Sequence, residues 1–284
     1  LDVVGYPAAD GGEKIFEAFP EQVQGYEGGF RLGGEKMFLD GSPQSRTAWM
    51  RTPYLGSEDC GYPVLTDEQV YEYTAAAVKS GRQILAHCNG DGAADQYLRA
   101  LSRLKEEGAH PEAVRPVMIH AQLLGLDQIP QLKRLGVIPS FFVAHVYHWG
   151  DTHIRNFGRE RASRISPAAS AGKAGLLYTF HQDAPVIRPD MMETVWCAVN
   201  RRTRAGELLG AEERVTAAEA LRAVTAAAAY QYREEGEKGT LTPGKREDLV
   251  ILDQNPLKTD PRHLRQIRVL ETIKDGTTIF KRKE

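Results

Sequence analysis

Short apolar runs alternate with amphipathic stretches over roughly the first 230 residues of the chain. Runs this short, without regular polar alternation, are typical of strands that are covered on both faces, as in parallel sheets. The runs that predict strands are Leu1–Tyr6, Lys36–Leu39, Gln83–His87, Val117–His120, Val137–Val143 and Leu176–Phe180.

Helical periodicity fills the intervals between these runs. Thr66 is a predicted N-cap, and Thr216 with Glu219 forms a predicted capping box. The predicted helices are Asp67–Lys79, a helix from about Asp91 to Gly108, Leu126–Leu135 and a helix from Thr216 to Tyr230. Repeated strand–helix units predict an α/β fold with a parallel sheet, most simply a (β/α)8 TIM barrel.

The sequence changes character from Gly236 onward. Gly239, Pro243 and Gly244 are turn residues, and Asp275-Gly276 separates two short strand-like runs in the manner of a β-hairpin. The predicted strands here are Leu249–Leu252, Arg268–Ile273 and Thr277–Lys281. We therefore expect a barrel domain over residues 1–235 and a small β module over residues 236–284.

Composition narrows the classes of protein that the chain can belong to. The 284 residues are 42% hydrophobic and 26% charged, which is typical of a soluble globular protein. A net charge of −2 gives no general attraction to nucleic acid or to a membrane surface. Cys60, Cys88 and Cys197 form no recognisable disulfide framework, which favours a reducing, cytoplasmic location.

Candidate catalytic chemistry lies at the ends of the predicted strands. His87 and His120 each close an apolar run, and Asp183 follows the run that ends at Phe180. In a barrel of parallel strands these ends meet on one face, where imidazole and carboxylate groups can share a metal ion. Any one of these residues alone is more often a structural hydrogen-bonding or capping group. Lys36, on an earlier strand, is costly to bury unless it is paired or chemically altered.

Four segments taken together resemble the amidohydrolase superfamily, and most closely its amidohydrolase 3 branch, which contains N-substituted formamide deformylases. A fifth segment, Gly34–Ser42 followed by Arg46 and Thr47, resembles the strand-four motif of that branch. The four segments are His87–Asp91, Ile119–Gln122, Thr179–Val186 and Gly239–Leu252. The resemblance implies a metal-dependent hydrolase with a TIM barrel and a small composite β-sandwich, to which residues 236–284 would contribute.

The resemblance also implies individual roles. His87 and His120 would be metal ligands, and Asp183 would bind metal and take a proton from the attacking water. Lys36 would be the lysine that is carbamylated in many relatives, so that it bridges two metal ions. The expected cofactor is one or two divalent ions, most simply zinc, and the expected reaction is hydrolysis of a small-molecule C–N bond other than a peptide bond, in an amide or formamide.

The sequence departs from the family at one motif, because it has no His-x-His pair for the more buried metal. We interpret the chain as one that begins near the third barrel strand, so that the first strands are absent. This predicts weak or no metal binding, little activity, and self-association through open sheet edges. The alternative to an active hydrolase is therefore a catalytically incomplete fragment or degenerate relative that keeps the fold.

Four further residues are candidates for substrate binding. His145 and His148 lie in a histidine-rich stretch that is expected to form a loop on the substrate side, with a plain surface loop as the alternative. His181 stands beside Asp183 and is expected to approach the metal. Arg46 is a candidate for binding a polar substrate group, although a structural salt bridge is the commoner role for such an arginine.

Overall fold

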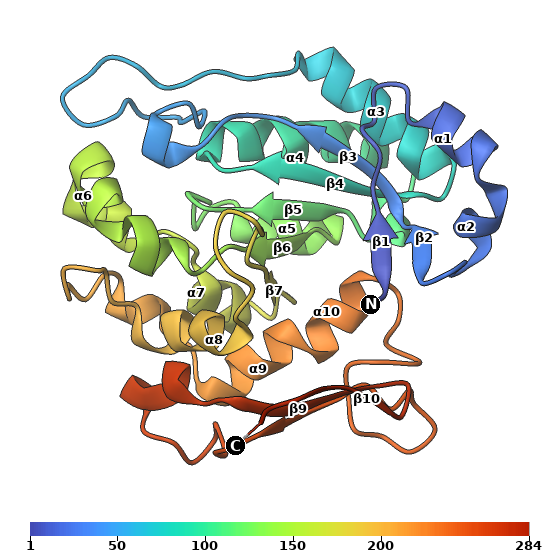
Figure 1. The fold of residues 1–284 in the computed structure, drawn as a ribbon. Helices are drawn as coiled ribbons and strands as arrows, with labels where there is room; N and C mark the ends of the chain where they lie inside the picture. Colours follow the sequence, from blue (N-terminus) through green and yellow to red (C-terminus); the bar gives the residue numbers. More distant parts are fainter. Residues whose placement is uncertain (284) are drawn as a thin grey trace.

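A five-stranded parallel sheet forms the centre of the molecule, as described by a computed structural model for residues 1–283 (Figure 1). Its strand order is β3-β4-β5-β6-β7, so every strand neighbours the next one along the chain. The strands are β3 (Gly34–Phe38), β4 (Gln83–Cys88), β5 (Val117–His120), β6 (Ile138–Phe141) and β7 (Thr179–Phe180). The predicted α/β fold with a parallel sheet is thereby confirmed.

The N-terminal segment runs along the β3 side of this sheet. Ala8 bridges Lys36 in parallel register, and the Lys36 amide donates to the Pro7 carbonyl at 2.8 Å. A separate parallel pair joins β1 (Val3–Gly5) to β2 (Phe30–Leu32). The short strand β2 was not expected from the sequence.

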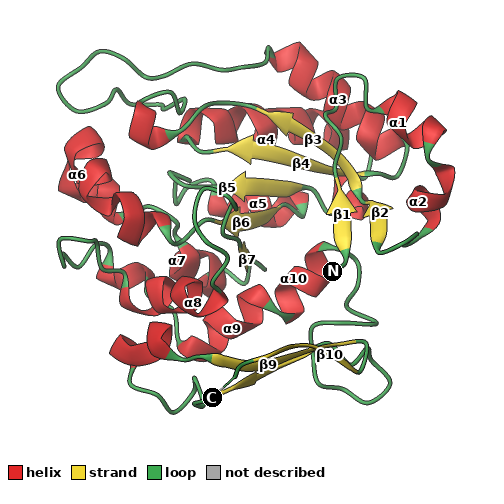
Figure 2. Ribbon diagram, viewed as in Figure 1, coloured by secondary structure: helices red, strands yellow, loops and turns green. Residues whose placement is uncertain are grey.

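Helices cover the parallel sheet and separate it from the C-terminal sheet (Figures 1 and 2). α3 packs on β3 and β4, α4 packs on β4, and α9 and α10 pack on β7. The helices are α1 (Glu13–Ala18), α2 (Pro20–Gln24), α3 (Asp67–Lys79), α4 (Asp91–Glu106), α5 (Ile129–Leu135), α6 (His145–Ser163), α7 (Ala168–Lys173), α8 (Met191–Asn200), α9 (Ala217–Val224) and α10 (Ala226–Gln231). None of the helices within residues 1–283 is long and apolar enough to cross a membrane.

Local signals explain where several helices begin and end. Thr66 and Gln69 form a reciprocal capping box at the start of α3, and Thr216 and Glu219 form another at the start of α9. Gly136 ends α5 in the left-handed conformation, with φ of 69°. These boundaries confirm the predicted caps, but the predicted helix through Tyr230 is broken at Thr225 into α9 and α10.

The two faces of the parallel sheet have different surroundings. On β4, Ile84, Ala86 and Cys88 belong to the main buried cluster, which also contains Tyr97 and Leu101 of α4. Leu85 lies on the opposite face in a smaller cluster with Val117 and Ile138. Side chains alternate along a strand, so His87 shares the face of Leu85. Lys36 pairs with Leu85 in the register, so it also shares this face.

The C-terminal sheet is antiparallel, with order β10-β9-β8. Its strands are β8 (Leu249–Leu252), β9 (Val269–Lys274) and β10 (Thr277–Lys281). Asp275 and Gly276 join β9 to β10 with φ of 47° and 74°, the left-handed values that a tight hairpin turn requires. The predicted hairpin and its turn are confirmed.

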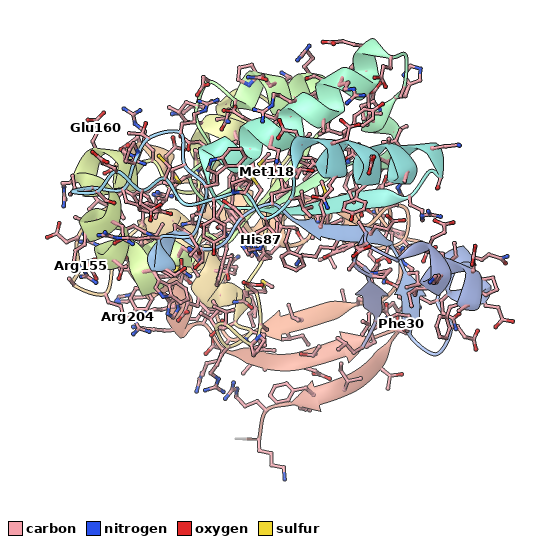
Figure 3. All side chains as sticks on the ribbon, turned by 90° about the horizontal axis from the view of Figure 1, so that it is seen from above. Phe30, His87, Met118, Arg155, Glu160 and Arg204 are labelled. Atoms are coloured by element: carbon pink, nitrogen blue, oxygen red, sulfur yellow. The ribbon has the colours of Figure 1, made fainter. Side chains whose placement is uncertain are left out.

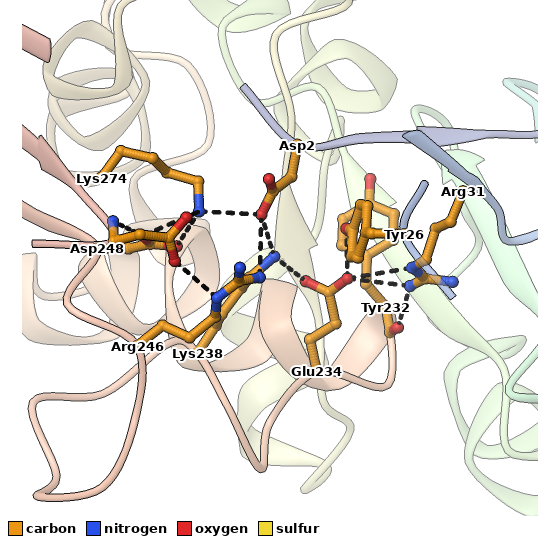
Figure 4. A network of polar contacts seen from close by, with 10 residues as sticks. Asp2, Tyr26, Arg31, Tyr232, Glu234, Lys238, Arg246, Asp248 and Lys274 are labelled. Atoms are coloured by element: carbon orange, nitrogen blue, oxygen red, sulfur yellow. Dashed lines mark hydrogen bonds and ion pairs between the residues drawn. The ribbon is translucent and has the colours of Figure 1, made fainter. Parts of the chain in front are cut away.

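A network of charged side chains connects the N-terminal segment with the C-terminal sheet (Figure 4). Asp2 pairs with Lys238 at 2.6 Å and with Lys274 of β9 at 3.2 Å. Glu234 pairs with Lys238 at 2.9 Å and accepts from the Tyr26 hydroxyl at 2.5 Å. Segments far apart in the sequence are thus held side by side.

The histidine-rich stretch expected to form a loop is helical, so that expectation was wrong. His145 to His153 form the first half of α6, and Val146, Gly150, His153 and Phe157 are buried at helical spacing. The helix was not predicted because two of its buried positions are a glycine and a histidine, so the sequence lacks a clear apolar periodicity there. The helix α8 was also missed.

Candidate active site

The rings of His87 and His120 meet on the sheet face opposite α4. His87 lies on β4 opposite Phe38 of β3, and its neighbour Cys88 lies opposite His120 of β5. The Nδ1 atom of His87 and the Nε2 atom of His120 are 3.1 Å apart. The structure therefore brings the two predicted histidine ligands into direct contact.

An unusual backbone conformation turns His120 towards His87. In a regular strand, His120 would point to the opposite face from Ile119, which lies beside His87 in the register. His120 instead has φ of 74°, and Ala121 after it has φ of 45°. Such left-handed values are costly for residues other than glycine, and they concentrate at functional sites.

Hydrogen bonds hold His87 from its other side. The Nε2 atom of His87 is 3.2 Å from the Gly41 carbonyl oxygen, which also accepts from the Asn89 side chain at 2.8 Å. A proton on Nε2 donated to Gly41 leaves the Nδ1 lone pair directed at His120. Such a bond to the second ring nitrogen commonly orients a metal-binding histidine.

His181 continues the contact on the far side of His120. Its Nε2 atom is 3.1 Å from Nδ1 of His120, and its Nδ1 atom is 3.0 Å from the Ser140 hydroxyl oxygen. His181 thus contacts His120, one of the two predicted metal ligands. Burial is the main cause that lowers the pKa of His181, to about 3, with the charge of Lys36 acting in the same direction.

Both candidate ligands are kept neutral. Burial lowers the pKa of His87, and the charge of Lys36 lowers it further while Asp183 opposes this. Burial also brings the pKa of His120 well below its ordinary value, and the neighbouring histidines add to the shift. Neutral imidazole is the form that binds a metal ion, so both rings are ready to do so at neutral pH.

Among the residues that the structure describes, no hydrogen bond or ion pair joins Lys36 or Asp183 to His87 or His120. Lys36 shares the His87 face of the sheet, and its Nζ atom is 4.9 Å from the centre of the Phe38 ring. Asp183 is exposed and has φ of 53°. Within residues 1–283, no group of three or more His, Cys, Asp or Glu side chains is arranged to hold a metal ion.

The remaining predicted residues are distributed around α6. His145 is buried with its ring 6.5 Å from that of His120. His148 contacts Glu193 at 2.8 Å and Arg204 at 3.1 Å. Arg46 is exposed and donates to Asn156 of α6 at 3.2 Å, which is a structural contact and not a salt bridge.

Asp40 is a buried residue of the site that sequence reasoning missed. Its carboxylate accepts from the backbone amides of Trp49, Asn89 and Gly90, and one oxygen is 3.8 Å from Nε2 of His87. Burial raises the pKa of Asp40 to about 7, although the three amides act in the opposite direction. Its position directly after a strand was the signal that could have found it. Figure 3 shows His87 towards the middle of the molecule.

Comparisons with known proteins identify the family of the chain. The sequence profile described as the Amidohydrolase family matches residues 3–280. The chain is 28% identical over 215 residues to the N-substituted formamide deformylase of Arthrobacter pascens, covering 75% of this chain and 39% of that enzyme.

Two solved structures of metal-dependent hydrolases are also similar to this chain. An uncharacterised metal-dependent hydrolase from Pyrococcus furiosus has a TM-score of 0.76 and 27% identity, covering 91% of this chain and 52% of that protein. Its counterpart from Pyrococcus horikoshii has a TM-score of 0.78 and 26% identity, covering 93% and 52%. The chain thus spans about half the length of these two hydrolases and less of the deformylase.

Proposed function

Because this chain belongs to the amidohydrolase family, we propose that it carries the metal-binding histidines of a hydrolase that cleaves a C–N bond in a small amide or formamide. The observation that carries the proposal is the 3.1 Å contact between Nδ1 of His87 and Nε2 of His120. The deformylase similarity supports the choice of a bond other than a peptide bond.

The two ring nitrogens fit a divalent cation. Two nitrogen ligands of a tetrahedral zinc ion, with bonds of about 2.0–2.1 Å, lie roughly 3.3 Å apart. The hydrogen bonds that link Ser140, His181 and His120 also allow the two nitrogens to bind a cation. If Ser140 accepts from His181 and His181 accepts from His120, both Nε2 of His120 and Nδ1 of His87 present lone pairs to each other.

In the proposed active site, His87 and His120 would hold a zinc ion together with Asp183 and a carbamylated Lys36. The cation would supply positive charge that polarises the scissile carbonyl and lowers the pKa of the attacking water. The Asp183 carboxylate would accept a proton from that water and deliver it to the leaving nitrogen. Gly41 and His181 would keep the two imidazoles oriented.

We further propose that β3 to β7 form part of an eight-stranded barrel over residues 1–235, and that residues 236–284 belong to a composite β-sandwich. The alternative function is that of a catalytically incomplete relative. Two observations favour it, namely the lack of a His-x-His pair in the sequence and the lack of a three-ligand group within residues 1–283.

Zinc titration of the metal-stripped chain by calorimetry tests the proposal. We expect one weak, saturable zinc site, because His87 and His120 are in contact while no group of three or more ligands is assembled within residues 1–283. His87→Ala and His120→Ala should each abolish this binding. His110→Ala is the matched control, since that side chain is 80% exposed and contacts Glu112, and it should leave the zinc affinity unchanged.

Two results would contradict different parts of the proposal. If zinc still binds to both His87→Ala and His120→Ala, the metal site does not include these two histidines. Tight stoichiometric zinc, lost in both variants, would support the histidine pair but contradict the incomplete site that the sequence predicts.

A further inference from the structure

A cavity of about 350 Å³ lies between α6, α8 and the segment that follows β7. Its walls include His148 and Trp149 of α6, Glu193 of α8, and Arg188 and Arg204. α6 follows β6 and Arg188 follows β7, so the cavity lies towards the carboxyl ends of the strands, where the candidate active site also lies.

Two connections lead from the candidate metal ligands to this cavity. The first is aromatic, because His145 stands 6.5 Å from His120 and 4.8 Å from Trp149, measured between ring centres. The second follows the chain. The Val186 amide donates to the Asp183 carbonyl at 2.8 Å, and Val186 lines the cavity. A substrate with its carbonyl near His120 and Asp183 would extend into this space.

A hydrogen-bonded relay fixes one guanidinium group on the cavity wall. His148 donates from Nε2 to the Glu193 carboxylate at 2.8 Å, and Arg204 donates from Nη2 to Nδ1 of His148 at 3.1 Å. A guanidinium group can only donate, so Nδ1 of His148 is the acceptor in this arrangement. Arg204 lies at the margin of the molecule, farther out than His87 (Figure 3).

The charges of the cavity are unbalanced. Its lining carries two guanidinium groups, from Arg188 and Arg204, and one carboxylate, from Glu193. Over residues 1–283, no ion pair neutralises either arginine, whereas Glu193 is already engaged by His148. Trp149, Val186 and Ile187 supply apolar wall beside these charges.

We propose that this cavity binds a carboxylate on the substrate, so that the substrate class is a small amide whose apolar body carries an anionic group. An arginine fork matches a carboxylate in shape and charge, and the apolar wall suits an aryl or alkyl body. The substrate part of the inference rests on the proposed hydrolase function, whereas the anion subsite itself does not.

A pair of formamides that differ only in charge tests the subsite without hydrolysis. The probes are 4-(formamidomethyl)benzoate and N-benzylformamide, titrated by calorimetry into the metal-stripped chain. At low salt the benzoate should bind about tenfold more tightly, and added salt should reduce this preference because the arginines are exposed to solvent. Equal binding of the two probes would overturn the proposal.

Two substitutions that remove charges of opposite sign distinguish loss of the subsite from a general loss of folding. Arg204→Gln should remove the preference for the benzoate, whereas Glu193→Gln should strengthen it, since a repelling charge is lost while a side-chain acceptor remains for His148. Arg202→Gln is the matched control, because Arg202 is exposed two positions away and donates to the Gly206 carbonyl.

An equal effect of Arg202→Gln and Arg204→Gln, or a weakened preference in Glu193→Gln, would contradict the subsite. Selective, Arg204-dependent binding by a chain that never hydrolyses either probe with metal added would support the subsite and count against the proposed hydrolase activity. Failure of the anion subsite and failure of the proposed hydrolase function therefore give different results.

Discussion

The positions of the ring and hydroxyl hydrogen atoms determine whether His87 and His120 can bind a cation. When the Ser140 hydroxyl donates to His181, donors can run in one direction through His120 and His87 to the Gly41 carbonyl. When Ser140 accepts instead, the two central nitrogens become acceptors that face each other. The first arrangement satisfies the chain without a cation, and the second provides the lone pairs that a cation requires.

His153 is a second histidine whose surroundings determine its protonation. It is fully buried within α6, and neither ring nitrogen has a hydrogen-bond partner in the part of the chain that the structure describes. Burial lowers the pKa of His153 from 6.5 to about 4. Between these values the unfolded chain binds a proton that the folded chain does not. The free energy of unfolding therefore falls as the pH is lowered through this window, and is fully retained above it.

Replacing His153 should remove this part of the pH dependence. In His153→Leu, the loss of unfolding free energy between about pH 7 and about pH 5 should be smaller by roughly 2 kcal/mol. Urea unfolding at the two pH values measures it. The exposed His110 provides the control, because His110→Leu should leave the wild-type slope in place. An unchanged slope in His153→Leu would show that His153 does not titrate as its burial implies.

At the level of elements, sequence patterns predicted the regular parts of the fold. Apolar runs located β4, β5 and β6 to within a few residues, because buried parallel strands need continuous hydrophobic sequence. The helix α6 was missed because a glycine and a histidine, Gly150 and His153, occupy two positions of its buried face. The sequence nevertheless singled out His148 of this helix as a substrate-binding candidate, and His148 lines the cavity beside α8.

The candidate site was predicted in part. Strand-end positions and family motifs singled out His87, His120 and His181, and the structure brings these three side chains into contact. The left-handed conformation of His120 has no signal in the sequence, and neither does the engagement of the Gly41 carbonyl, because both depend on how neighbouring strands end. Asp40 was overlooked although it follows a predicted strand, because its contacts with three backbone amides depend on the folded loops around it.

A substitution at the junction between β4 and α4 would test how closely the elements at the site are packed. A Cβ atom added to Gly90 would lie 1.9 Å from the Trp49 carbonyl oxygen and 2.5 Å from the carbonyl carbon. Gly90→Ala must therefore displace backbone beside Asp40, and should cost about 1–3 kcal/mol in the free energy of unfolding. Urea titration measures this value.

Gly25→Ala is the matched control for this substitution. Gly25 is extended, with φ of −178°, and no atom lies within 4 Å of an added Cβ. If the two variants unfold at the same urea concentration, the packing at the β4–α4 junction is looser than described.

For the whole molecule, exposed apolar strands favour self-association. β10 is an edge strand of the C-terminal sheet, and Ile279 on it is 61% exposed, while Val250 on β8 at the other edge is 59% exposed. Unpaired strand edges with apolar side chains are templates for pairing with another chain. We therefore expect dimers or larger assemblies in light scattering of the purified chain.

A charge on the edge strand should oppose this association. Ile279→Lys is expected to shift the light-scattering mass towards the monomer. Thr242→Lys adds the same charge at an exposed position before β8 and should leave the wild-type mass unchanged. A single sharp monomer peak for the wild-type chain would contradict the expected association.

The proposed metal site depends above all on His87 and His120 as a pair of ligands. Zinc-edge anomalous diffraction from crystals of the chain soaked in zinc measures this directly. We expect a peak in contact with both Nδ1 of His87 and Nε2 of His120. No peak at that position under saturating zinc, or a peak confined to other histidines, would contradict it.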